Sequence, residues 1–372
     1  MDPNCLLDPI LRDIIAPDAA RIDREGVFPG QAIDALGRAG LLGLMNSSEV
    51  GGMRLGLAAA AGVVERIAEA CASTAMVVTM HYCGAAVLEK FASEALRREI
   101  ASGRHLTTLA WSEAGSRSHF WAPVGTAIPD GEDCLLDGEK TMVTSAGQAD
   151  SLVWSSRPAA AEGASTLWLV EKGTRGLVVP AAFDGMGLRG NASSPMRAVA
   201  MRLPASARLG EDGGGFDIMM SVVLPLFSVL VASCSIGLME AAIRGASAHV
   251  AGNRLEHLGS ALSDLPTIRA YLGRSRIRAD SARTLRDDTI SALSANRGDA
   301  MLRVLEAKAV AAEAALEVTD VAMRVCGGAA FRKDLGIERN FRDARAAAVM
   351  APTSDVLFDF IGKSACGLPL FG

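Results

Sequence analysis

The sequence of 372 residues contains no C-x-x-C pair, although it has seven cysteines. They stand at positions Cys5, Cys71, Cys83, Cys134, Cys234, Cys326 and Cys366. Because they are odd in number and widely scattered, they indicate neither a disulfide framework nor a zinc site. Reduced thiols in a cytoplasmic protein are the simplest interpretation, and no metal is expected.

An excess of positive charge is lacking as well, since 37 Lys and Arg stand against 42 Asp and Glu and the formal net charge is −5. The basic residues are spread along the chain, and no basic patch is interleaved with aromatic residues. Both observations argue against nucleic-acid binding. The N-terminal stretch MDPNCLLDPILRDII places acids early and has no basic segment, so it does not predict a signal peptide.

One apolar run has the length of a membrane span, because the residues from Ile218 to Met239 include no charged side chain. The run contains Pro225, however, and it continues into Glu240 and Arg244. A helix that is apolar all round either crosses a membrane or forms the buried centre of a large helical protein. With a single such segment and no flanking charge asymmetry, a buried core helix is predicted and no membrane contact is expected.

Two parts of the chain have the apolar spacing of helices. In residues 1–105, helices are predicted at 31–42, 57–72, 73–91 and 94–102. After residue 209, long helices are predicted at 217–251, 263–294, 298–325 and 352–364. Short antiparallel connections between long helices are typical of a four-helix bundle.

Between these parts, residues 106–208 contain short runs rich in Val, Leu, Thr and Trp that are bounded by glycine, proline and aspartate. Such runs are typical of the strands of an antiparallel barrel or sandwich. Two D-G-E tripeptides, at 130–132 and 137–139, predict hairpin turns. The sequence therefore predicts an α+β protein that is mostly α. It has an N-terminal helical domain (1–105), a central β-barrel or sandwich domain (106–208) and a C-terminal four-helix bundle (209–372).

Four segments carry motifs that occur in the same order in one enzyme family. The first is WSEAGSRSH (111–119), and the second is GEKTMVTSAGQAD (138–150). The third, LGEDGGGF (209–216), leads into a helix with SIGLMEAA (235–242), and the fourth is RVCGGAAFRKDLGIERNFRDA (324–344). They resemble the T-E-P-G-x-G-S-D loop, the G-x-K-x-W-I-T-N-G-x-x-A strand and the Q-x-x-G-G…E-R-x-x-R-D-A region of the acyl-CoA dehydrogenase superfamily. The resemblance covers nearly the whole chain and implies the acyl-CoA dehydrogenase fold.

The resemblance implies a site for FAD, whose pyrophosphate needs hydroxyl groups and unobstructed backbone N–H groups. Ser112, Thr144 and Ser145 are expected along the polar rim of the isoalloxazine ring, and Thr353 near the pyrophosphate. The full set of residues expected to bind the cofactor is Trp111, Ser112, Gly115, Ser118, Met142, Thr144, Ser145, Arg254, Arg324, Gly327, Gly328, Thr353 and Asp355.

Some of these residues are implied to act across a subunit boundary. Gly327 and Gly328 match glycines that approach the adenine half of FAD bound to a neighbouring subunit, and Arg324 begins the same motif. A glycine pair after a helix is also commonly only its C-cap. Arg254 is a candidate phosphate contact, although its spacing to the following Leu-Gly pair is one residue off the family's R-x-x-F-G. A homodimer or homotetramer is expected.

The residues that carry the family's chemistry are replaced. In the family, a carboxylate removes the α-proton of an acyl thioester and the β-hydride passes to flavin. The glutamate of the usual Y-E-G-T motif corresponds to Ala351, and the alternative position for the base corresponds to Phe227. A D-x-x-R pair that holds the pantetheine arm corresponds to Pro225 and Ser228, and the loop aspartate to His119. Because a positioned base contributes roughly 10²- to 10⁴-fold in rate, either another residue acts as the base or the reaction needs none.

Three residues are alternatives for the missing base. His81 lies on a helix that lines the substrate cavity in relatives, although a hydrogen-bonded structural histidine is the commoner case. Asp355 lies one helical turn past Ala351, although a carboxylate at a helix N-terminus often serves only as a cap. Glu113 is typical of the family and is expected to be structural.

The leading hypothesis is therefore an FAD-dependent oxidoreductase acting on an acyl thioester, carried by CoA or by an acyl-carrier protein. Loss of the D-x-x-R pair favours the carrier protein or a substrate without CoA. A flavin-dependent monooxygenase or oxidase of the same fold is the alternative, because it needs no α-proton base. A third possibility is a catalytically degenerate partner subunit, against which the FAD motifs argue. Productive oxygen consumption separates the first two.

Overall fold

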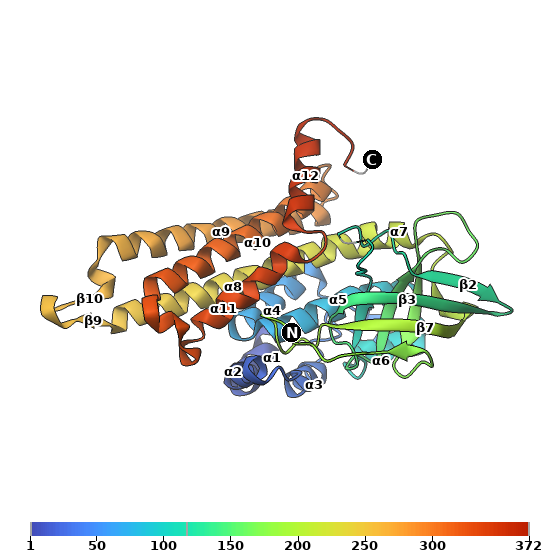
Figure 1. Ribbon diagram of the computed structural model, residues 1–372, viewed down its shortest axis with the longest axis horizontal. Coiled ribbons are helices and arrows are strands. Elements are labelled where there is room, and N and C mark those ends of the chain that lie inside the picture. Colours follow the sequence, from blue (N-terminus) through green and yellow to red (C-terminus); the bar gives the residue numbers. More distant parts are fainter. Residues whose placement is uncertain (1, 117, 371–372) are drawn as a thin grey trace.

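The computed structural model describes residues 2–116 and 118–370. It confirms the predicted order of a helical region, a β-domain and a second helical region (Figure 1). The N-terminal helices are α1 (Pro3–Ile10), α2 (Ala16–Glu25), α3 (Gly30–Arg38), α4 (Gly56–Ala70), α5 (Ala72–Phe91) and α6 (Glu94–Ala101).

Helix α3 ends at Arg38 and not at Leu42, where the apolar pattern predicts its end. Gly40 adopts a φ of 76°, and the N–H of Leu41 donates to the carbonyl of Leu36 at 2.9 Å. A left-handed glycine with this bond pattern closes a helix and leaves the next apolar residue packed against its last turn. The apolar pattern continues past the helix because the chain that follows is also buried.

Two four-stranded sheets form the β-domain. One has the order β1 (Thr107–Ala110), β4 (Ser151–Ser156), β5 (Thr166–Glu171) and β8 (Arg208–Leu209). The other has the order β2 (Thr126–Asp130), β3 (Asp133–Val143), β7 (Ser194–Pro204) and β6 (Leu177–Val178). Side chains from both sheets share one core, which includes Trp154, Trp168 and Leu136. The predicted sandwich is confirmed, except that β1 and β4 run parallel.

Only one of the two D-G-E tripeptides forms a hairpin turn. The first joins β2 to β3 through Gly131, which has a φ of 67°. The second lies inside β3, where the register against β7 shifts between Leu136 and Gly138. A β-bulge has replaced the expected turn because β3 stays paired with β7 on both sides of the glycine.

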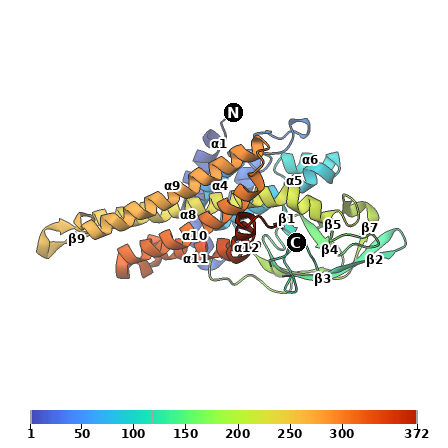
Figure 2. The same cartoon turned by 90° about the horizontal axis from the view of Figure 1, so that it is seen from above.

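The C-terminal region is a bundle of long helices. Helix α7 (Gly215–Ile218) continues through a π-helical segment (Met219–Val223) into α8 (Leu224–Gly252). Helices α8, α9 (Pro266–Ser294), α10 (Ala300–Cys326) and α11 (Ile337–Val349) run side by side along the long axis, whereas α12 (Ser354–Ala365) stands away from it (Figures 1 and 2). The predicted four-helix bundle is confirmed, but its fourth helix is α11, whereas the helix predicted at 352–364 corresponds to α12 outside the bundle. Helix α11 falls in the R-V-C-G-G…R-D-A motif, where the apolar pattern predicts no helix.

The apolar run is the central helix of the molecule. The helix spanning Gly215–Gly252 has the length and composition of a membrane span, but 83% of its most apolar window is buried inside the protein. At Gly237 an added Cβ would lie 2.2 Å from the carbonyl oxygen of Glu65, so α8 and α4 approach at backbone distance. The prediction of a buried core helix is confirmed.

Candidate active site

A cavity of about 980 Å³ lies between the β-domain and the helices α5, α8, α11 and α12. This volume is near the upper end of the range of small-molecule sites. Its β-domain side is lined by Ser112, Glu113, Ala114, Gly115, Ser116, Ser118, His119, Thr141, Met142 and Thr144. Its helical side includes Met76, Met80, Phe227, Ala346, Val349, Met350, Ala351, Thr353, Asp355 and Val356. The cavity therefore joins the first and second sequence motifs to the segment that replaces the family's glutamate.

The loop after β1 is anchored by a buried ion pair beneath the cavity. The Lys140 ammonium donates to Oε1 of Glu113 at 2.5 Å and to the carbonyl and Oγ of Ser155 at 2.7 and 2.8 Å. Oε2 of Glu113 accepts the backbone N–H of Val124 at 2.6 Å and of Gly125 at 3.2 Å. Burial lowers the pKa of Lys140 to about 8, although the Glu113 carboxylate opposes the change. Glu113 therefore holds the loop in place, which is the structural role expected from the sequence.

The N-terminus of α12 meets this loop across the cavity. Ser118 donates from Oγ to Oγ1 of Thr353 at 3.2 Å, and Thr353 is the residue before the first turn of α12. Oγ of Ser116 and Oγ of Ser354 are buried and have no hydrogen-bond partner among the described residues. Free N–H groups and the dipole at a helix N-terminus favour an anion, and the orphaned hydroxyls can add donors to it. These residues fit the pyrophosphate of a dinucleotide such as FAD.

A narrow branch leads away from the large cavity. It has a volume of about 70 Å³, and Met80, Ser112, Met142, Phe227 and Ala351 line both spaces. The rest of its lining consists of aromatic and aliphatic side chains, which are Trp111, Phe120, Leu109, Val223 and Leu224. The Trp111 and Phe120 rings stack with centroids 5.9 Å apart. The branch has room for a small apolar group.

The two positions where the family carries its base are apolar, because Ala351 and Phe227 both face these spaces. Among the described residues that line them, the carboxylates are Glu113 and Asp355. Asp355 is exposed in the first turn of α12. Since Glu113 is paired with Lys140, Asp355 is the carboxylate left to reach a bound substrate.

His81 has a structural role in the interior. Its Nδ1 accepts the backbone N–H of Thr107 at 3.2 Å, and its Nε2 lies 3.2 Å from the carbonyl oxygen of Leu42, to which it donates in this tautomer. Burial, helped by the neighbouring His105, lowers the pKa of His81 to about 4, although the hydrogen bond with Leu42 opposes the change. Both ring nitrogens are engaged, and the ring is outside the described lining of the cavity. The structure therefore does not support His81 as the base.

The expected cofactor residues fall into separate groups. Those brought together at the cavity and its branch are Trp111, Ser112, Gly115, Ser118, Met142, Thr144, Thr353 and Asp355. Ser145 lies next to them, but it has a φ of 61° and donates its backbone N–H to the carbonyl of Asn191 at 2.9 Å. Its main chain therefore contributes to the shape of the site.

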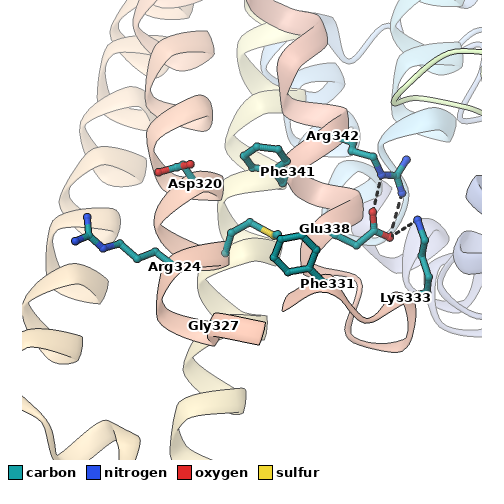
Figure 3. A pocket seen from close by; sticks show the side chains of 9 residues that line it. Asp320, Arg324, Gly327, Phe331, Lys333, Glu338, Phe341 and Arg342 are labelled. Atoms are coloured by element: carbon teal, nitrogen blue, oxygen red, sulfur yellow. Dashed lines mark hydrogen bonds and ion pairs between the residues drawn. The ribbon is translucent and has the colours of Figure 1, made fainter. Parts of the chain in front are cut away.

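Arg324 and Gly327 line a different cavity, of about 630 Å³, between α10 and α11 (Figure 3). Gly328 follows them in the turn Gly327–Phe331, where the side chain of Phe331 is 79% exposed. Arg254 lies in β9 (Arg254–Leu255), at the tip of the bundle far from the β-domain (Figures 1 and 2). Within one chain, these residues do not belong to the site that contains Ser118 and Thr353.

One lining segment is missing from the residues expected from the sequence. Residues 183–193 contribute Phe183, Gly185, Met186, Gly187, Leu188, Asn191 and Ser193 to the cavity. Helix α11 holds this segment: Asp343 accepts the N–H of Leu188 at 2.6 Å, and Arg342 donates to the carbonyl of Met186 at 2.8 Å. Burial raises the pKa of Asp343 to about 6. The G-M-G-L-R-G run between two strands is the signal that could have identified it.

The same α11 residues form a structural ion-pair network. Arg342 pairs with Asp23 of α2 at 2.6 Å and with Glu338 at 2.6 Å. The network is largely buried, with side-chain exposures of 16% for Arg342 and 11% for Asp23. The arginine of the R-D-A motif therefore has a structural role.

The chain matches three family models in the order of its regions. They are acyl-CoA dehydrogenase N-terminal domain (residues 8–103), middle domain (108–199) and C-terminal domain (213–366). Short-chain specific acyl-CoA dehydrogenase, mitochondrial, of Homo sapiens is 30% identical over 349 residues, which cover 91% of this chain and 83% of that protein.

Solved structures share the whole fold. Butyryl-CoA dehydrogenase from Megasphaera elsdenii superposes with a TM-score of 0.90 at 22% identity, covering 97% of this chain and 96% of that one. The prolyl acyl carrier protein oxidase AnaB superposes with a TM-score of 0.88 at 20% identity, covering 97% and 98%. From its sequence matches and its site, this chain belongs to the acyl-CoA dehydrogenase family of flavin-dependent oxidoreductases.

Proposed function

We propose that this protein binds FAD non-covalently in the large cavity and oxidises an acyl thioester whose acyl group enters the narrow branch. The observation that carries the proposal is the division of the cavity into two unlike walls. The β-domain wall carries hydroxyl groups and glycines and faces the N-terminus of α12, whereas the rest of the helical wall is apolar and leads into the branch beside Ala351. A polar dinucleotide and an apolar acyl group need these two surfaces side by side.

In this assignment, Ser116, Ser118 and Thr353 hold the pyrophosphate together with the N–H groups of α12. Ser112 and Thr144 face the polar rim of the ring system, and Thr144 is kept in place by a 3.0 Å hydrogen bond between its Oγ1 and Oγ of Ser193. Bound FAD would supply the acceptor for the hydride removed from the substrate. The protein's part is to orient the acyl group, to exclude water and to hold the proton acceptor.

The branch favours a short or compact acyl group, since it is small and lined by the bulky rings of Trp111, Phe120 and Phe227. The human relative acts on short-chain acyl-CoA, and the AnaB oxidase on a prolyl group carried by an acyl-carrier protein. Either carrier fits the proposal. Pro225 and Ser228, at the positions of the family's D-x-x-R pair, offer no charge to a pantetheine arm, but both carriers have this arm, so the substitutions do not choose between them.

The proton acceptor is non-standard in this proposal. Ala351 and Phe227 supply no carboxylate, and Glu113 is bonded to Lys140. Asp355 is therefore the residue to test first, because it lines the cavity one turn into α12. Replacement by asparagine keeps its shape and removes the charge. If dehydrogenation is unchanged in Asp355→Asn, the reaction needs no carboxylate from α12.

We further propose that a neighbouring subunit completes the FAD site. Arg324 and Gly327 line the second cavity, which is open to the surface and carries exposed Phe331, and Gly328 is the next residue along the chain (Figure 3). Arg254 is exposed at the tip of the bundle. In a closed homodimer or homotetramer these residues can approach the cofactor of another copy. Light scattering that gave a stable monomer with full FAD occupancy would contradict this assembly.

The experiment for the main proposal has two steps. Purified protein is heat-denatured and the released cofactor is identified by mass, with FAD expected. The holoprotein is then mixed anaerobically with straight-chain acyl-CoAs and with acyl groups loaded on an acyl-carrier protein, and flavin bleaching is recorded. A colourless protein that neither FAD nor FMN reconstitutes would remove the cofactor assignment.

The apolar side chains at Ala351 and Phe227 also favour a second candidate, an oxidase or monooxygenase of the same fold. Such a reaction needs space beside the flavin and no α-proton base at these positions. The two functions differ in their use of oxygen. Productive oxygen consumption with reduced flavin, with product oxygenation or stoichiometric peroxide, would favour the second. The built cofactor wall argues against a catalytically degenerate partner subunit.

A further inference from the structure

A second buried lysine lies behind the segment that carries Ala351. Lys308, on α10, is 0% exposed. Its ammonium donates to three backbone carbonyl oxygens, those of Ala347 at 3.1 Å, Met350 at 3.1 Å and Pro352 at 2.7 Å. Ala347 lies in the last turn of α11 and Met350 is its C-cap. One side chain thus spans the end of α11 and the turn into α12.

These bonds satisfy groups that would otherwise be orphaned. The last carbonyls of a helix have no partner within the helix, and a cation there also interacts favourably with its dipole. Burying the ammonium still costs desolvation free energy, because no carboxylate among the described residues hydrogen-bonds to it. Burial lowers the pKa of Lys308 to about 7. An apolar side chain of similar length would fill the same volume without this penalty, but it would leave three carbonyls unpaired.

The turn held by Lys308 forms the wall of the candidate active site. Met350 and Ala351 line the large cavity, and Ala351 also lines the branch. Thr353 accepts the hydrogen bond from Ser118 on the opposite wall. Lys308 is therefore on the far side of the turn from the cavity, and it bonds to the carbonyls on both sides of Ala351.

We propose that Lys308 is a positioning residue, which fixes residues 347–353 so that Ala351 closes the substrate branch and Thr353 meets the cofactor loop. The proposal rests on the proposed function for its consequence in catalysis, but not for its structural part. Loss of the ammonium releases the turn at three points. Because a hydrogen bond to a charged group is stronger than a neutral one, the local opening equilibrium is expected to rise at least about tenfold.

The test compares Lys308→Met with Leu305→Ala. Leu305 is 0% exposed on the same helix, and its truncation destabilises the bundle through a cavity without removing a bond to the turn. Hydrogen exchange by mass spectrometry is measured on peptides covering residues 346–357, with thermal unfolding of both variants as the reference. Lys308→Met is expected to accelerate exchange there at least about tenfold over Leu305→Ala, and to weaken FAD binding by a similar factor. Equal exchange and equal FAD affinity in the two variants would overturn the proposal.

A further pair of variants covers the case in which Lys308→Met does not fold. Lys308→Gln keeps a neutral donor and is expected to give an intermediate exchange rate, measured in the same peptides. Combining it with Ser118→Ala should give non-additive losses of FAD affinity, because the two residues hold one turn from opposite sides. Additive losses together with unchanged exchange would overturn the proposal. If no variant and no wild-type protein binds FAD, the proposed function fails, and the exchange data alone decide the role of Lys308.

Discussion

The two walls of the cavity are built on opposite principles. The β-domain wall is polar, and several buried hydrogen bonds hold it in place. Through Glu113 and Lys140, these bonds connect the loop after β1 to strands β3 and β4. The helical wall is apolar at Ala351 and Phe227, the two positions where the family carries its base. The comparison teaches that the two proposed tasks depend mostly on different elements, since the expected cofactor residues Ser112, Ser118 and Thr144 belong to the β-domain and Ala351 and Phe227 to the helical side. The N-terminus of α12, with Thr353 and Asp355, is the part of the lining that both proposed tasks share.

The largest effect is expected from restoring a carboxylate to the helical wall. Ala351→Glu would place it beside the branch, where burial raises a carboxyl pKa toward neutrality and suits a general base. Anaerobic flavin bleaching by straight-chain acyl-CoAs should rise by roughly 10²-fold or more. Phe227→Glu tests the alternative position in the same assay.

The contrast between the two walls would be wrong if the flavin of the unmodified protein is already bleached rapidly by these acyl-CoAs. That outcome would show that another residue fills the vacancy at Ala351. Asp355→Asn is then the first replacement to make, since Asp355 is the lining carboxylate that forms no ion pair with another described residue.

The next effect tests the rigidity of the β-domain wall. Lys140→Met leaves the Glu113 carboxylate buried without its cation, and breaking a buried pair costs about 3–5 kcal/mol in the free energy of unfolding. Urea unfolding measures this loss. Arg197→Met is the matched control, because it breaks the exposed Arg197–Glu139 pair of the neighbouring strands and should cost less than about 1 kcal/mol. Similar losses in both variants would mean that the wall does not depend on its buried pair.

A pH effect of similar size is expected from His81, which joins α5 to the start of β1. Its pKa falls from an ordinary 6.5 to about 4 on folding, so its contribution to stability is complete above pH 6.5 and is lost as the pH falls toward 4. The loss amounts to roughly 3 kcal/mol. Asp343, whose pKa is raised to about 6, titrates with the opposite sign. The difference in unfolding free energy between wild type and His81→Gln therefore isolates the histidine, and it should shrink between pH 7.5 and 4. A constant difference across this range would contradict the assignment.

The smallest expected effect is a change in FAD affinity, and it tests whether the helical side also helps to bind the cofactor. Thr353→Val removes the hydroxyl that meets Ser118, and it should weaken FAD binding by about fivefold, or about 1 kcal/mol. Fluorescence titration of the apoprotein measures the Kd. Thr284→Val, which removes an exposed hydroxyl of α9, should leave the Kd unchanged. An unchanged Kd in Thr353→Val would mean that the Thr353 hydroxyl does not contribute to FAD binding. Cofactor binding would then depend on the β-domain wall, and the contrast between the two walls would be stronger.

Local patterns predicted most of the fold. The uncharged run from Ile218 to Met239 identified the core helix, because burial on all sides leaves no position for charge. The short apolar runs of residues 106–208 likewise predicted the strands of the β-domain. The parallel pairing of β1 with β4 was not predicted, since strand direction depends on a partner more than forty positions away, Thr107 facing Ser151. The second D-G-E stayed inside β3, opposite an extra residue of β7, for the same reason.

The sequence by itself determined the family, the order of the three regions and the absence of a carboxylate at Ala351 and Phe227, because these are properties of residue type at a fixed position in a motif. Only the tertiary structure decided which side chains share the cavity. It placed His81 in the interior, brought residues 183–193 to the site through Asp343, and put the Lys308 ammonium behind the turn. Each of these outcomes depends on contacts between segments far apart in the chain, and neither the period of a helix nor a local motif encodes those distances.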